Sequence, residues 1–488
     1  MTADFAARAR ELGFLLASWP SVTASQGEAA LPQKLADHLS HFDKTWVAAI
    51  PDDPFGRSNV FALKRGKSRR TIVLTGHFDT VSFDDYGELA DLALKPDELS
   101  RAIVKKLNAS GSHPLALDDL ESGTFIPGRG LLDMKAGLAA GLAAMEAYEG
   151  DATLLFIGVS DEEEKSAGAR ATIPQLKAVA AEHGLEIALV INLDSISDQG
   201  DGAKGRVVTF GSIGKQLLTA FVVGKQAHAG YPQDGANAAY IMAELVRALE
   251  LAPELSEATG AEVAAPPSTL FTKDLKQGYN VTSPARAFAY WNTMQHRRSG
   301  AEVLDVAMGL AGKAVAEAQH RTGHAIALRR YADMGSNGRR ADPWLSLPDQ
   351  TLAALNAFAD EKQIDTPTVI LGFGSIPYPA VRLRDVKLRL LIEKAVQPFG
   401  LGSVNYFAGI SDMSFFGEAA GDMAVVAANT PIWGSGFTMP EPGGYPSVNI
   451  GPWGRDYHHW LERLHAPYAF ETLPNVLLAV IDAVAKAG

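Results

Sequence analysis

Residues 71–82 read TIVLTGHFDTVS and join a strand-like segment to a pair of polar side chains. The segment TIVLTG (71–76) is apolar or β-branched with little alternation, which is typical of a strand buried on both faces of a parallel sheet. His77 and Asp79 follow it at once. Taken alone, these two side chains could be a satisfied polar pair near a strand end. Their meaning depends on whether other strands end in the same way.

Two further segments have the same buried-strand character, ATLLFIGV (152–159) and EIALVINL (186–193). Helical patterns accompany them, the Ala-rich MKAGLAAGLAAMEAYEG (134–150) and GARATIPQLKAVAAEHG (168–184). Strands that alternate with helices indicate an α/β fold with helices on both faces of the sheet. We therefore expect a mixed, mostly parallel sheet flanked by helices.

The pattern changes between residues 206 and 331. The expected elements there follow the order β-β-α-β-β-α-β, which is close to a ferredoxin-like sandwich. They are strands at 206–210 and 217–225, a helix at 234–251, a hairpin of 277–282 with 285–292, a helix at 301–323 and a strand at 324–331. We predict an inserted α+β domain at 206–331, within a discontinuous first domain formed by residues 1–205 and 332–488.

The composition excludes several classes of protein and of site. The chain has 488 residues, 47% of them hydrophobic, so it is long enough for a large core in two or three domains. A formal net charge of -12 argues against nucleic acid as a partner, because phosphate binding needs a basic face. There is no cysteine, so a metal site would be built from His, Asp and Glu.

The sequence contains no uninterrupted apolar run of the roughly 20 residues that a membrane-spanning helix requires. The N-terminal segment MTADFAARARELGFLLASW (1–19) is interrupted by charges and resembles an amphipathic helix more than a signal peptide. We therefore expect a cytoplasmic protein with no membrane partner.

Acidic side chains follow the other strands as well. The second strand runs into residues 161–164 (DEEE), the third runs into Asp194, and Asp133 precedes the Ala-rich helix. The carboxyl edge of an open α/β sheet is where ligands bind. Carboxylates crowded there repel each other and raise each other's pKa, which one or two divalent cations would relieve. Helix capping by these acids is the alternative, but capping does not explain His77.

Seven short motifs follow one another along the chain. They are HFDT (77–80), GRGLLDMKAG (128–137), SDEEEKSAGA (160–169), NLDS (192–195), GKQAHAGYPQDGANAA (224–239), AGISDMSFFG (408–417) and NIGPWGRDYHHWLE (449–462). Their order and spacing resemble the M20 family of metallopeptidases and amidohydrolases, which includes aminoacylases and glutamate-type carboxypeptidases. With its length and its GPWGRDYHHW ending, the chain is most similar to the subgroup labelled arginine-utilisation proteins.

This resemblance implies a catalytic domain with an inserted lid or dimerisation domain, and a homodimer through that domain as one arrangement. It also implies two divalent metal ions per subunit, with zinc expected and manganese or cobalt as alternatives. The implied ligands are His77 and Asp194 for one ion, Glu163 and His458 for the other, and Asp133 as the bridge between them. His459 is the alternative to His458, which the family pattern favours because it lies four residues before a glutamate.

The resemblance implies catalytic roles for three further residues. Glu162 would be the general base, and Asp79 would lie behind His77 and orient its ring, as the i, i+2 spacing permits. His228 would stabilise the oxyanion, from its own subunit or, as in dimeric relatives, from the neighbouring one. The alternative for His228 is an ordinary histidine of a surface loop.

The segment YNVTSPARAFAYWNTMQHRRS (279–299) departs from the family pattern. Relatives that cleave C-terminal amino acids carry N-V-[IV]-P and then D-x-R, whose Asn and Arg grip the substrate carboxylate. Asn280 fits, but Asn292 and Met294 occupy the D-x-R positions, so the guanidinium is missing there. Arg297 or its neighbour is a candidate substitute. We expect Asn280, Asn292 and Arg297 around the substrate, and whether a free carboxylate is needed stays open.

The expected function is a dinuclear metal-dependent hydrolase that cleaves a C–N amide bond in a small peptide or in an N-acyl or N-carbamoyl amino acid. One alternative is an amidase that acts on a non-amino-acid amide. The other is a non-catalytic metal- or ligand-binding protein that kept the fold. Segments 81–127 and 332–400 are long for this family, and their role stays open.

Overall fold

The structure, a computed structural model, describes residues 2–260, 262–335, 338–339, 342, 344–407, 409–419, 421 and 423–487. The chain divides into two units. Unit 1 consists of Met1–Ser212, Arg382–Glu418 and Pro442–Gly488, and unit 2 of Ile213–Val381 and Ala419–Glu441. Residues 332–381, which the sequence pattern assigned to the first domain, therefore lie in unit 2.

Unit 1 is built on an eight-stranded mixed sheet with strand order β1-β2-β5-β3-β6-β19-β8-β18. Its strands are β1 (Lys44–Ala49), β2 (Ser58–Lys64), β3 (Arg70–His77), β5 (Thr153–Val159), β6 (Glu186–Asn192), β8 (Val207–Thr209), β18 (Gly402–Val404) and β19 (Ser447–Asn449). The central strands β5, β3, β6 and β19 run parallel, whereas β1 and β2 are antiparallel additions. The expected mixed, mostly parallel sheet is confirmed, and its three expected strands are β5, β3 and β6.

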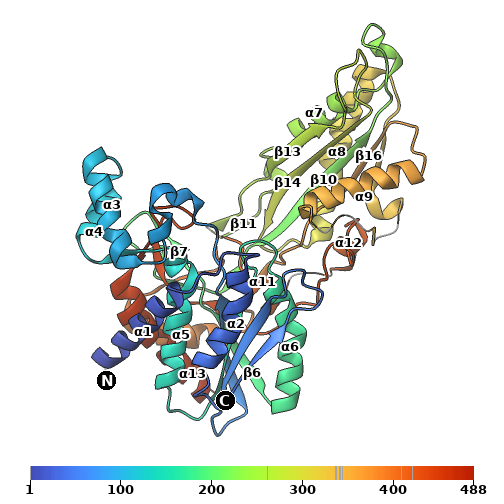
Figure 1. Cartoon of the computed structure of the whole chain (residues 1–488). Coiled ribbons are helices and arrows are strands. Elements are labelled where there is room, and N and C mark those ends of the chain that lie inside the picture. Colours follow the sequence, from blue (N-terminus) through green and yellow to red (C-terminus); the bar gives the residue numbers. More distant parts are fainter. Residues whose placement is uncertain are drawn as a thin grey trace. The chain divides into compact units, whose positions relative to one another are not determined.

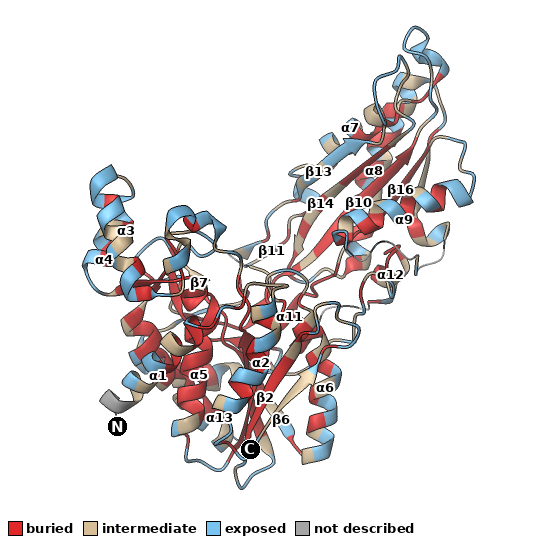
Figure 2. Ribbon diagram, in the orientation of Figure 1, coloured by how far each residue is buried: buried red, intermediate tan, exposed pale blue. Residues whose placement is uncertain are grey.

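Helices cover both faces of this sheet (Figure 1). On one face lie α1 (Thr2–Ala17), α2 (Gln26–His38), α5 (Ala136–Ala147), α10 (Val386–Val396) and α13 (Leu473–Lys486), which share one apolar core with the sheet. Helix α6 (Ala167–His183) packs against β2 and β5. Helix α5 is buried around its whole circumference from Ala136 to Met145 (Figure 2), which explains why its sequence is Ala-rich and carries no charge there.

One segment, Pro467–Lys486, is long and apolar enough to cross a bilayer by length and composition alone. Its helix α13 supplies Val476, Leu477, Val480 and Ile481 to the core of unit 1, as a core helix of a globular domain does. The segment is therefore weak evidence for a membrane span.

The long segment between the first two motifs forms a helical insert in unit 1. It contains η1 (Asp84–Leu92), α3 (Pro96–Ser110) and α4 (Pro114–Glu121). The chain then enters a small four-stranded sheet with strand order β4-β21-β20-β7. The strands of this sheet are β4 (Phe125–Pro127), β21 (Arg463–His465), β20 (Trp453–Arg455) and β7 (Ile196–Ser197).

Unit 2 has a five-stranded sheet with strand order β13-β14-β10-β16-β15. The strands are β10 (Gly214–Val223), β13 (Ser268–Asp274), β14 (Arg286–Gln295), β15 (Ala327–Arg330) and β16 (Thr368–Phe373). Helices α7 (Ala238–Leu249) and α8 (Gly300–Thr322) share one apolar cluster with the sheet, and α9 (Leu347–Glu361) shares another. The chain order β10-α7-β13-β14-α8-β15 is ferredoxin-like, with β16 inserted between β10 and β15.

Two details of the sequence prediction for unit 2 were wrong. Residues 206–210 do not begin this unit, because β8 pairs with β18 and β19 in the sheet of unit 1. The partner of β14 is 268–274 and not 277–282. Strand β13 lies at the sheet edge and is mostly exposed, so it lacks the apolar pattern that identifies a buried strand.

The remaining short strands and α-helices of the described residues are β9 (Gly211–Ser212), β11 (Ala258–Thr259), β12 (Glu262–Val263), β17 (Val381–Arg382), α11 (Met413–Phe416) and α12 (Ala424–Ala428). The other short helical turns are η2 (Leu131–Lys135), η3 (Pro232–Asp234), η4 (Pro253–Leu255), η5 (Tyr331–Asp333), η6 (Gln397–Phe399) and η7 (Pro467–Thr472).

The first turn of helix α5 approaches the backbone just after β6 so closely that only glycine fits at position 137. A Cβ on Gly137 would lie 2.1 Å from the backbone oxygen of Leu193, whereas a Cβ on Gly141 would meet only the Leu193 side chain, at 2.6 Å. We predict that Gly137→Ala lowers the free energy of unfolding by about 1–3 kcal/mol, because backbone must move. Urea denaturation measures this.

Gly141→Ala is the matched control. Both substitutions gain about 1 kcal/mol of helix propensity, so their difference isolates the backbone clash. Equal stabilities of the two variants would contradict the prediction.

Candidate metal centre

The side chains that follow the central strands of unit 1 lie at one edge of its sheet. Strands β5, β3 and β6 are adjacent and parallel, with His77 opposite Val159 and Thr75 opposite Asn192. Their carboxyl ends therefore meet, as parallel pairing requires. This places His77, the loop after β5 and Asp194 side by side.

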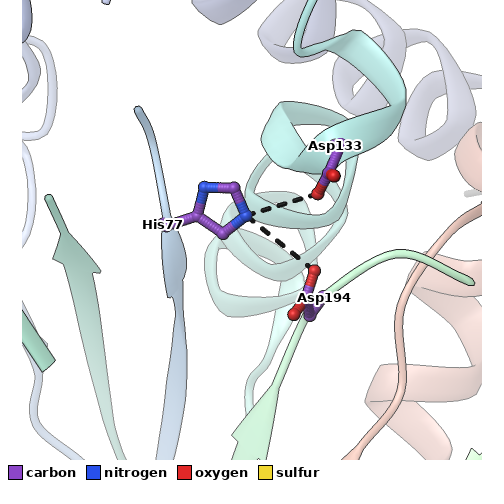
Figure 3. Close-up of side chains that lie close together, drawn as sticks. All are labelled: His77, Asp133 and Asp194. Carbon is purple, nitrogen blue, oxygen red and sulfur yellow. Dashed lines mark ion pairs between the residues drawn. The ribbon is translucent and has the colours of Figure 1, made fainter. Parts of the chain in front are cut away.

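Three buried side chains form the first group, His77, Asp133 and Asp194 (Figure 3). His77 Nε2 lies 3.3 Å from Asp133 Oδ1 and 3.9 Å from Asp194 Oδ1. One donor atom of each residue lies within 4.8 Å of the other two. A single cation could therefore contact all three.

The second group consists of Asp133, Glu163 and His458. His458 Nε2 lies 3.2 Å from Asp133 Oδ2 and 3.0 Å from Glu163 Oε2. Asp133 thus faces His77 with one carboxylate oxygen and His458 with the other. The structure brings together all five side chains that the resemblance implied as metal ligands, in the implied two sets with Asp133 shared.

The two adjacent histidines, His458 and His459, face different partners. His458 faces the carboxylates, whereas His459 Nδ1 accepts a hydrogen bond from the backbone N–H of Leu461 at 3.3 Å. The peptide bond Asp133–Met134 just before α5 is cis.

Asp79 fixes both His77 and the loop that carries Glu162 and Glu163. Its backbone oxygen lies 3.0 Å from His77 Nδ1, so Nδ1–H donates there and Nε2 is left to face the acids. The Asp79 carboxylate accepts hydrogen bonds from the backbone N–H groups of Glu162 (3.1 Å) and Glu163 (3.2 Å). Asp79 therefore orients the ring with its carbonyl, and its carboxylate positions the neighbouring loop.

The Glu162 carboxyl group borders this cluster, with its Oε2 4.0 Å from His77 Nε2. Burial raises its pKa well above the usual value for glutamate, and the nearby acids Asp412, Asp194 and Glu163 add to the shift, while His77 opposes it. A buried carboxyl group with a raised pKa among other acids is a candidate for general acid–base catalysis.

Burial and neighbouring charges shift the pKa of several groups in this cluster. Burial favours neutral His458, but its bonds to Asp133 and Glu163 outweigh this and raise its pKa to about 10. Burial alone would raise the pKa of Asp133, yet the two histidines hold it well below its usual range. Burial raises the pKa of Asp194 to about 7, with help from Asp133.

These donors fit two divalent cations. Each group offers one imidazole nitrogen and carboxylate oxygens, the donor atoms that zinc, manganese and cobalt accept in proteins. Divalent cations would also offset the negative charge of the neighbouring acids. The acid cluster is therefore suited to metal binding.

The remaining predicted residues belong to unit 2. His228 is exposed, and its Nδ1 accepts a hydrogen bond from the backbone N–H of Gly230 at 3.1 Å. The loop of His228 runs beside the loop of Asn280, since His228 bridges to Thr282 and Ala229 N–H donates to Val281 O at 2.9 Å. The structure brings these two loops together.

Asn292 and Arg297 do not join His228 and Asn280. Asn292 lies on β14, opposite Leu217, roughly 20 Å along the strand from the end that leads to the Asn280 loop. The guanidinium of Arg297 is exposed and donates to the backbone oxygen of Ala258 at 3.4 Å.

Sequence analysis did not identify Asn449 as a site residue. Its side chain accepts from the backbone N–H of Asp194 at 3.0 Å and donates to the Asp194 carbonyl at 2.9 Å. Its Oδ1 also accepts from Asn192 Nδ2 at 3.0 Å. The available signal was its place at the start of the last motif, NIGPWGRDYHHWLE.

The chain is similar to known proteins of one peptidase family. The model of peptidase family M20/M25/M40 matches residues 73–436. Among curated proteins, YqjN of Bacillus subtilis is 30% identical, and the alignment covers 96% of this chain and 95% of YqjN. RocB of Bacillus subtilis is 26% identical, with 97% and 94% covered, which accords with the expected arginine-utilisation subgroup.

Among solved structures, a tripeptidase from Staphylococcus aureus superposes with a TM-score of 0.58 at 15% identity and covers 99% of both chains. That likeness supports the fold. The family model and the likeness to YqjN together cover most of the chain, and this protein therefore belongs to the peptidase family M20/M25/M40 and is a hydrolase of that family.

Proposed function

We propose that the protein is a dinuclear metal-dependent hydrolase that cleaves the C–N amide bond of a small peptide or of an N-acyl or N-carbamoyl amino acid. The observation that carries this proposal is the shared carboxylate. Asp133 presents one oxygen to His77 and the other to His458, so two cations bound by these groups would be neighbours.

The two proposed metal positions have separate ligand sets. His77 and Asp194 would hold one ion, Glu163 and His458 the other, and Asp133 both. Zinc is the metal we propose, with manganese or cobalt as alternatives that the same donors accept. Cations in such positions lower the pKa of a bound water and polarise a carbonyl group.

Glu162 is the proposed general base. Its carboxyl group lies beside His77, its backbone is held by Asp79, and burial gives it a raised pKa. It would take a proton from the attacking water and pass it to the leaving amine. A fixed backbone keeps the carboxyl group aligned for both transfers.

His228 is the proposed oxyanion donor. Because its Nδ1 accepts from Gly230, the ring proton sits on Nε2, which is then free to donate to a negatively charged oxygen. We propose that it acts from its own subunit or, in a homodimer formed through unit 2, from the other one. Asn280, on the neighbouring loop, would contact the substrate. Asn292 and Arg297 stay weaker proposals, since they lie apart from this pair of loops.

A second candidate function is an amidase whose substrate lacks a free carboxylate. Relatives place aspartate and arginine at two positions where this chain has Asn292 and Met294. The guanidinium that would bind a substrate carboxylate is therefore missing there, which favours this function. We propose a cytoplasmic location in either case.

The testing experiment measures amine release from dipeptides, N-acyl and N-carbamoyl amino acids and simple amides, with protein loaded with zinc, manganese or cobalt. Cleavage of compounds with a free carboxylate supports the first function. Cleavage of simple amides alone supports the second, and cleavage of none would contradict both.

Glu162→Gln removes the proposed base but keeps the shape of the side chain. We predict that kcat falls by about 10²–10⁴-fold, the usual contribution of general acid–base catalysis. Metal content, measured by mass spectrometry of the elements, should stay unchanged because Glu162 is not a proposed ligand. Unchanged turnover in a metal-loaded sample would show that the mechanism is wrong.

His458→Ala removes a ligand of the second group only. We predict that the number of tightly bound cations falls from two to one per chain, because His77, Asp133 and Asp194 keep the first group intact. Equilibrium dialysis with elemental analysis gives this number. His459→Ala is the adjacent control and should keep two cations; equal losses in both variants would refute the assignment.

Metal binding should also release protons. The pKa of His458 is about 10 in the metal-free fold, so its ring is protonated at neutral pH and a cation must displace that proton. Apparent metal affinity should therefore rise as pH increases toward 10. Calorimetry at pH 7 in two buffers of different ionisation enthalpy counts the protons, and identical heats in both buffers would contradict this.

A further inference from the structure

The loop that carries His458 is closed by a pair of arginines. Strands β20 and β21 form an antiparallel hairpin in which Arg455 lies directly opposite Arg463, and residues 456–462 form the loop between them. Like charges at directly opposed positions destabilise a hairpin. Both arginines are buried, so water does little to screen their repulsion.

A single carboxylate of the helical insert joins these two arginines. Asp119, on α4, accepts a hydrogen bond from Arg455 Nη1 at 2.5 Å and from Arg463 Nε at 2.7 Å. Asp119 is itself buried. The insert thus supplies the negative charge that lets the base of the loop close.

Arg463 also connects Asp119 to the residues next to His458. Arg463 Nη1 also binds Asp456 Oδ2 at 2.5 Å, and Gln199 Nε2 donates to Asp456 Oδ1 at 2.9 Å. Asp456 and His458 both have positive φ, 55° and 61°, a conformation that side chains other than glycine rarely adopt. Such a conformation persists only when its surroundings hold it.

The insert is also connected to the C-terminal end of the loop, at Leu461 and Glu462. Arg129 Nη2 binds Asp85 Oδ1 of η1 at 2.7 Å, and Arg129 Nη1 binds Glu462 Oε2 at 2.7 Å. Leu461 belongs to the apolar cluster of the insert, with Leu99 and Ile103 of α3. Apolar packing and two sets of ion pairs therefore tie the loop to the insert.

We infer that the helical insert Asp84–Glu121 is a clamp for the His458 loop and that Asp119 is a positioning residue for the second metal site. This inference rests on the proposed function, because the position of His458 matters only if His458 is a ligand. Groups behind a metal ligand fix its orientation, and their loss commonly weakens metal binding by about 10–100-fold.

The test compares Asp119→Asn with Asp118→Asn, the exposed neighbour on the same helix. Hydrogen exchange of the metal-free protein should become at least about 10-fold faster in residues 456–462 of Asp119→Asn, with strand β3 unchanged, because loop opening is local. Cobalt or zinc titration should show the second cation bound about 10–100-fold more weakly and the first bound as before. Asp118→Asn should match the unaltered protein, and Asp119→Glu should recover part of both effects.

Unchanged loop exchange in Asp119→Asn would overturn the inference, and so would an equal increase in β3, which would mean general destabilisation. The hydrogen-exchange measurement needs no metal. If the unaltered protein bound fewer than two cations, the proposed dinuclear function would be wrong, but hydrogen exchange of the metal-free protein would still test whether the insert holds the loop.

Should Asp119→Asn not fold, Asp85→Asn tests the partly exposed second contact. It should give a smaller increase in loop exchange in the same direction, and no increase would overturn the inference.

Discussion

The carboxylate of Asp133 is the constraint on which the rest of unit 1 depends. Its two oxygens face two histidines, one at the end of β3 and one in a loop near the end of the chain. Buried acids repel each other unless protons or cations lie between them. The fold must therefore bring cation-binding nitrogens to this carboxylate from both sides, and the strand order of the sheet together with the β20–β21 hairpin does so.

Close packing of backbone against backbone fixes the positions of the acids in this cluster. Helix α5 begins at Ala136, shortly after Asp133, and its Gly137 leaves no room for a side chain against the Leu193 carbonyl. A Cβ on Gly451 would lie 2.0 Å from the backbone oxygen of Asp194, so the last motif also lies directly on the end of β6. Glycines at these contacts allow backbone to approach backbone, which side chains would prevent. The acids are thus positioned by main-chain contacts as well as by hydrogen bonds.

The helical insert adds charge balance to this arrangement. Arg455 and Arg463 would repel each other across the hairpin if Asp119 were absent. The carboxylate of Asp119 is buried together with both arginines. Removing it would leave two buried positive charges without this shared negative partner. A segment that looks like an addition to the catalytic domain is therefore connected to the backbone of one candidate ligand.

The sequence by itself determined the elements whose pattern is local. Unbroken apolar runs identified β3, β5 and β6, and the side chains after them indicated a ligand-binding edge of the sheet. The individual candidate ligands, including Asp133 and His458, came from the resemblance to the family. Only tertiary structure decided the edge strand β13, the placement of β16 in unit 2 and the role of Asp119, which meets Arg463 across 344 residues of chain. The reason is physical: periodicity records which face of a local segment is buried, whereas strand partners and ion-pair partners depend on the path of the whole chain.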